Sequence, residues 1–100
     1  MTINNIFTMY SDPGHAWLQV THQDLCNVGL RPIDFSEFSF RGRDCFYLEE
    51  DCDAPKFLKA FESLHKQLII NNVYTNSESF IRLLPSINYP KQAYLKQYAV

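Results

Sequence analysis

One short segment, residues 47–55, constrains the fold of this chain more than any other. It reads Tyr-Leu-Glu-Glu-Asp-Cys-Asp-Ala-Pro, a hydrophobic, strand-like beginning followed by four carboxylates within five positions. Asp53 is a favourable helix N-cap, and Pro55 suits the first helical turn, where its missing N–H is not needed. The segment therefore predicts a strand, an abrupt acidic turn and a helix. Because carboxylates complement the positive end of a helix dipole, the first interpretation of this acidic run is structural.

Two β-hairpins are predicted before this junction. The turn signals are Ser11-Asp12-Pro13-Gly14 and Arg41-Gly42-Arg43-Asp44, and each lies between segments rich in apolar or alternating residues. The expected strands cover residues 3–10, 15–20, 37–41 and 45–49. We therefore expect a single α+β domain over residues 1–100, with an antiparallel sheet of about four strands.

The main helix is expected over residues 54–66, packed on one face of that sheet. Phe57, Leu58, Phe61 and Leu64 recur at helical spacing, so we expect these four side chains to be buried together. Further elements are predicted as well: a short helix over 22–28, a second one capped by Ser77, a terminal helix over 91–98, and a strand over 67–74 that Asn71-Asn72 interrupts.

Composition limits the class of protein. Of the 100 residues, 46% are hydrophobic and 15% aromatic, which argues against disorder. The nine Lys and Arg are scattered and the net charge is −2, so no direct binding of nucleic acid is expected. No signal peptide or membrane-length apolar run is seen, so we expect a cytoplasmic protein that does not bind membranes. Three cysteines are too few for a disulfide framework; Cys26 and Cys45 are expected in the core.

Residues that could carry chemistry are few. The three histidines form no i, i+4 pair and no glycine-rich phosphate loop is present, so an enzyme is not expected, and no metal or cofactor is assigned. The best alternative ligand site joins Asp12 and His15 to the carboxylates of Glu49, Glu50 and Asp51, if the two hairpins bring their ends together. Clustered oxygens of this kind suit a divalent cation.

Several segments resemble one family. The residues are Ser11-Asp12-Pro13-Gly14-His15-Ala16-Trp17-Leu18, then Phe38-Ser39-Phe40, then residues 47–53, and finally Phe80-Ile81-Arg82-Leu83-Leu84-Pro85. Together they resemble a family of small uncharacterised proteins of tailed bacteriophages and prophages, over most of residues 7–85. The resemblance implies a product made in the cytoplasm of a bacterial host. It carries no catalytic residue, and it implies by association a protein that binds a host partner, including defence systems such as CRISPR complexes.

Two functional hypotheses follow from the sequence. The first is a non-enzymatic interaction protein whose acidic residues Glu49, Glu50 and Asp51 contact a basic surface of a host protein or complex, with an anti-defence inhibitor as its specific form. Tyrosines near the C-terminal end would add amphipathic contacts; they are Tyr89, Tyr94 and Tyr98. The second hypothesis is a small enzyme or ligand-binding domain that uses Asp12, His15 and the same carboxylates around a cation or small molecule.

Overall fold

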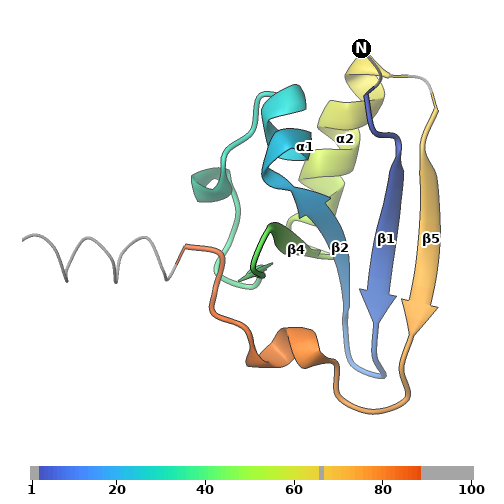
Figure 1. Cartoon of the computed structure of the whole chain (residues 1–100), viewed down its shortest axis with the longest axis vertical. Coiled ribbons are helices and arrows are strands. Elements are labelled where there is room, and N and C mark those ends of the chain that lie inside the picture. The colour runs from blue at the N-terminus through green and yellow to red at the C-terminus, as the bar shows by residue number, and fades with distance from the viewer. Residues whose placement is uncertain (1–2, 66, 89–100) are drawn as a thin grey trace, which may run out of the picture.

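The computed structural model describes residues 3–65 and 67–88, which form an α+β fold with one mixed sheet (Figure 1). The strands are β1 (Ile6–Ser11), β2 (Ala16–Thr21), β3 (Phe40–Arg41), β4 (Cys45–Glu49) and β5 (Ile69–Tyr74). The helices are α1 (His22–Asn27) and α2 (Ala54–Leu64), with short 3₁₀ helices η1 (Pro32–Asp34) and η2 (Phe80–Leu83). The predicted terminal helix and the three tyrosines Tyr89, Tyr94 and Tyr98 lie outside the described residues.

Both predicted hairpins are confirmed. β1 pairs with β2 and β3 pairs with β4, each pair antiparallel, and β2 joins β4 so that the two hairpins share one sheet. α1 is also confirmed, with a capping box in which the Thr21 hydroxyl accepts from the Asp24 N–H and the Asp24 carboxylate accepts from the Thr21 N–H. The strand order across the sheet is β3-β4-β2-β1-β5.

The expectation of four antiparallel strands is wrong in one respect. A fifth strand, β5, lies beside β1 and runs parallel to it, so the sheet is mixed. The reason is the connection from β4 through α2, which crosses one face of the sheet before β5 begins (Figure 1). A crossover of this kind returns the chain in the same direction, whereas a hairpin turn reverses it.

The main core lies between α2 and the sheet. Phe57 and Phe61 of α2 are fully buried, and each packs edge-to-face on Phe7 of β1, with ring centroids 5.2 and 5.3 Å apart. Leu58 is partly buried, but Leu64 is 59% exposed, so its expected burial is wrong. α2 ends at Leu64 and His65 is extended, so Leu64 is the last helical residue and lies beyond Phe61, the last buried side chain of the helix.

A smaller core covers the other face of the sheet at one end. It contains Trp17, Tyr47 and Ile81, the last contributed by η2. η2 is capped by Ser79, whose hydroxyl accepts from the Ile81 N–H, and not by Ser77 as predicted. The chain after η2 then runs beside β3, where the Ile87 N–H donates to the Ser39 carbonyl.

The predicted positions of two cysteines are also wrong. Cys26 is exposed on α1 and Cys45 is half-buried, while all three cysteines are free thiols. Cys26 follows the buried residues Asp24 and Leu25 of this short helix, and each helical residue is rotated by about 100° from the one before it, which turns the thiol away from the core. Among the described residues, no helix has the length and apolar character needed to cross a bilayer.

Candidate functional site: an acidic, aromatic groove at the ends of β2 and β4

Asp12 organises the turn between β1 and β2. Its Oδ1 atom accepts hydrogen bonds from the backbone N–H groups of Gly14 (2.9 Å) and His15 (3.0 Å), the arrangement of an Asx turn. The turn role considered for Asp12 from the sequence is therefore confirmed.

The same carboxylate also binds a distant residue that the sequence did not indicate. Arg82 Nε lies 2.6 Å from Asp12 Oδ2 and Nη2 lies 2.8 Å from Oδ1, so the pair is bidentate. The Ser79 N–H donates to Oδ2 as well. The Arg82 guanidinium, more than any other group, holds the pKa of the Asp12 carboxyl well below its usual range, and Asp12 in turn raises the pKa of Arg82.

Gly14 leaves room for that ion pair. A Cβ atom at this position would lie 2.7 Å from Arg82 Nη2, closer than non-bonded atoms approach. The guanidinium also lies over the ring of Trp17, with 5.3 Å between Cζ and the ring centroid. Asp12 and Arg82 thus fasten η2 to the β1–β2 turn.

His15 approaches the acidic turn, as the sequence hypothesis required, but Asp12 does not. The half-exposed imidazole of His15 has its Nδ1 atom 3.9 Å from Glu49 Oε1. Asp12 interacts with the backbone of His15, and its carboxylate is occupied by Arg82. The proposed ligand set of Asp12, His15 and the 49–51 carboxylates is therefore only partly brought together.

Glu49, which the binding hypothesis requires to be accessible to a partner, is instead buried, with 6% of the residue exposed. It is the last residue of β4 and lies opposite Trp17 of β2. Its Oε2 atom accepts from the N–H groups of Asp51 (2.9 Å) and Cys52 (2.8 Å), so Glu49 closes the turn that leads to α2. A buried carboxylate is tolerated here because backbone donors replace the lost water.

Glu50 and Asp51 differ from Glu49 in being exposed. Neither forms an ion pair with any described residue. One oxygen from each of Glu49, Glu50 and Asp51 can be placed within 4.8 Å of the others, a spacing open to a cation. A hydrogen bond to Glu49, together with burial and the neighbouring carboxylates, raises the pKa of the Cys52 thiol, which therefore lacks the thiolate character of a nucleophile.

The predicted capping role of Asp53 is wrong. Asp53 does stand at the N-cap position of α2, but its side chain makes no capping hydrogen bond. The buried carboxylate instead accepts from the Ser36 N–H (3.0 Å), the Ser36 hydroxyl (2.7 Å) and the Ser39 hydroxyl. Ser39 Oγ in turn accepts from the Glu49 N–H, so Asp53 joins the loop before β3 to the end of β4.

A groove of about 480 Å³ opens beside the acidic turn. Aromatic side chains and carboxylates share its lining, which comprises His15, Trp17, Glu37, Phe38, Phe40, Glu49, Asp51, Cys52 and Arg82. Trp17 is buried at 2% exposure and packs on Phe40, whereas Phe38 is 57% exposed. We name this feature the acidic groove. Sequence reasoning found two of its carboxylates, Glu49 and Asp51, but missed Glu37 and the aromatic wall, because Phe38 and Phe40 read only as alternating strand residues.

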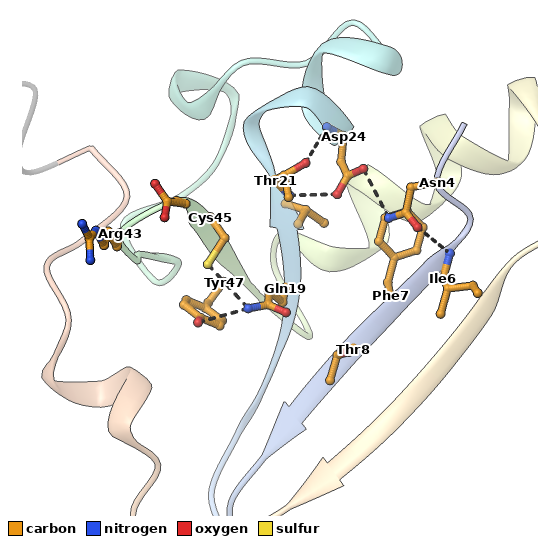
Figure 2. A pocket seen from close by; sticks show the side chains of 12 residues that line it. Asn4, Ile6, Phe7, Thr8, Gln19, Thr21, Asp24, Arg43, Cys45 and Tyr47 are labelled. Atoms are coloured by element: carbon orange, nitrogen blue, oxygen red, sulfur yellow. Dashed lines mark hydrogen bonds between the residues drawn. The ribbon is translucent and has the colours of Figure 1, made fainter. Parts of the chain in front are cut away.

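A second hollow lies on the open face of the sheet and differs in its polar groups (Figure 2). The side-chain amide of Gln19 donates to Tyr47 Oη at 3.3 Å and contacts Cys45 Sγ at 3.6 Å. Asn4 donates to Asp24, which already belongs to the capping box. Burial, more than any other cause, raises the pKa of Tyr47 to about 12. Because these groups satisfy one another, this hollow is a weaker candidate than the acidic groove.

Comparisons with protein-family models, with curated proteins and with solved structures give no match for this chain.

Proposed function

We propose that this protein is a non-enzymatic binding protein that attaches to a basic surface of a host protein or complex through the acidic groove. The observation that carries the proposal is the state of Glu50 and Asp51. Both are exposed, Asp51 on the lining of the groove and Glu50 beside it in the chain, and no described cation neutralises them. Uncompensated exposed charge attracts a partner of opposite charge and accelerates association with it.

The groups that catalysis would need are already engaged in structural interactions. Asp12 is bound to Arg82, and Glu49 accepts from two backbone N–H groups. Cys52 is held as a thiol. A binding role uses the exposed carboxylates as they stand, whereas the alternative enzyme or ligand-binding role with Asp12 and His15 would have to displace the Arg82 guanidinium first.

The setting of this function follows from the resemblance to phage and prophage proteins. In that setting the partner is a protein of the bacterial host, and the specific form of the proposal is an anti-defence inhibitor. A nucleic-acid-binding groove, as in a CRISPR complex, is a basic surface of the kind that Glu50 and Asp51 would match.

Affinity capture of the tagged full chain from bacterial cells tests the proposal. The wild type is compared with a Glu50→Lys/Asp51→Lys double variant and with a matched control, Asp44→Lys/Glu62→Lys. The control reverses two exposed carboxylates that lie outside the groove, so it changes the net charge equally.

We expect one partner to be retained by the wild type and by the control, lost by the groove variant, and released as salt rises. Melting temperatures of all three proteins are measured alongside. Equal retention by the two double variants, both folded, would contradict the proposed function.

A further inference from the structure

The acidic groove combines aromatic rings and carboxylates in its lining. Phe38 and Phe40 supply aromatic surface, and the buried Trp17 ring packs behind Phe40, with ring centroids 6.1 Å apart and an interplanar angle of 69°. Glu37 and Asp51 are exposed carboxylates on its lining. A ligand that fits must therefore offer both an apolar or π-stacking surface and positive charge.

The charge of the groove is unbalanced. Three carboxylates line it, those of Glu37, Glu49 and Asp51, and its one guanidinium belongs to Arg82. The Arg82 guanidinium is already paired with the Asp12 carboxylate, which does not line the groove, so this pair carries no net charge. The net negative charge of the groove consequently favours a cationic occupant.

One ring of the aromatic wall is left exposed to solvent. Phe38 is 57% exposed although the neighbouring Ser39 is fully buried, so the fold presents this ring to solvent. An exposed ring beside carboxylates offers a face on which a planar cation can stack.

We propose that the acidic groove receives an arginine side chain from the partner, with its guanidinium between the aromatic wall and the carboxylates of Glu37 and Asp51. This inference rests on the proposed function and names the group that is recognised. Arginine fits better than lysine because its planar guanidinium stacks on rings and binds carboxylates in a fork. The molecule already contains such a contact, since Arg82 lies over the Trp17 ring.

Trp17 makes the proposal directly testable because it is the only tryptophan in the chain. The full chain is titrated with capped glycine-rich peptides that carry a central arginine, lysine or glutamine, while the indole N–H resonance and the fluorescence of Trp17 are followed. We expect a saturable change with the arginine peptide, with a dissociation constant on the order of 1 mM. The lysine peptide should bind several-fold more weakly, and the glutamine peptide should leave the signal unchanged.

Two groove variants locate the site. Glu37→Gln combined with Asp51→Asn should weaken binding of the arginine peptide about tenfold, because two charged acceptors are lost. Phe38→Ala should weaken it several-fold, and neither change should unfold the protein because all three side chains are exposed. The control, Asp44→Asn with Glu62→Gln, should bind as the wild type does.

Equal signals for the arginine and glutamine peptides, or equal affinity of groove and control variants, would overturn the arginine proposal. The proposed function would survive that result if the captured partner were still lost on reversal of Glu50 and Asp51. The opposite result is also possible to distinguish. If the captured partner is retained after that reversal while the arginine peptide still binds specifically, the proposed function is overturned and the groove remains an arginine site.

Discussion

The turns after β1 and after β4 are closed by the same kind of hydrogen bonding, but the first is neutral and the second keeps a negative charge. In each, a carboxylate accepts from two backbone N–H groups just ahead in the chain: Asp12 from Gly14 and His15, and Glu49 from Asp51 and Cys52. The first turn is then neutralised by the Arg82 guanidinium. The second has no described guanidinium or ammonium partner and adds the exposed charges of Glu50 and Asp51.

This difference separates structural carboxylates from those free to bind. A carboxylate paired with a guanidinium and backbone donors holds two chain segments together and has little charge left to offer. An exposed carboxylate without a cation contributes little to folding but acts on an approaching partner. The β1–β2 turn therefore fastens η2, and the β4–α2 turn is the surface that we propose for recognition.

The largest effect is expected for the buried carboxylate at the end of the second turn. Asp53→Ala leaves the hydroxyls of Ser36 and Ser39 and a backbone N–H without their acceptor. We expect a loss of about 3–5 kcal/mol in the free energy of unfolding, because each unsatisfied buried group costs roughly 1–3 kcal/mol. Denaturant unfolding measures it. A loss of only about 0.5–2 kcal/mol, the range of a simple helix cap, would contradict the buried network and agree with the capping role predicted from the sequence.

The next effect concerns the fastening of η2. Arg82→Ala should clearly lower the melting temperature, because Asp12 is left buried without its counter-ion. The melting temperature of Arg82→Lys should lie between those of Arg82→Ala and the wild type, since an ammonium cannot reproduce the bidentate pair. Arg31→Ala is the control, because the Arg31–Asp34 pair is exposed and should contribute only about 0–1 kcal/mol. Similar melts for Arg82→Ala and Arg31→Ala would remove the distinction between the two turns.

The pH dependence of stability also tests the Asp12–Arg82 pair. The pKa of Asp12 is held well below its ordinary value by Arg82, so the folded protein keeps this carboxylate ionised where the unfolded chain protonates it. Its contribution to stability is therefore complete above the unfolded pKa of about 3.9 and declines as pH falls further. The difference in unfolding free energy between wild type and Asp12→Asn should be constant from about pH 5 to 7 and shrink below about pH 4. A difference that grew on acidification would have the wrong sign for this pair.

The smallest effect is expected from divalent cations. Magnesium or calcium should leave the melting temperature unchanged, because Glu49 Oε2 is already engaged by two backbone N–H groups and only Glu50 and Asp51 remain free. A ligand that binds only the folded state would raise the melting temperature with a saturable dependence on concentration. Such a rise, if abolished by Glu50→Gln, would turn the second turn into a cation site and favour the ligand-binding hypothesis.

Local patterns were sufficient to predict much of the fold. Asp12-Pro13-Gly14 and Arg41-Gly42-Arg43 indicated the two hairpins, and the Thr21–Asp24 spacing indicated α1. These features depend on neighbours within a few residues, where backbone geometry and hydrogen bonding are set by the sequence itself. The parallel pairing of β5 with β1 escaped prediction, because it joins segments about sixty residues apart through a crossover whose course no local pattern specifies.

The candidate site likewise has features that the local sequence predicts and features that only the tertiary structure sets. The sequence by itself determined that four carboxylates gather between β4 and α2, since their positions in the chain are adjacent. Only the tertiary structure decided which of them are free: Glu49 and Asp53 turn inward to backbone and serine donors, while Glu50 and Asp51 remain in solvent. It also brought Arg82 to Asp12, seventy positions away, and Phe38 and Trp17 to one groove. Charge is a property of the residue, but its availability depends on burial and on partners that folding alone supplies.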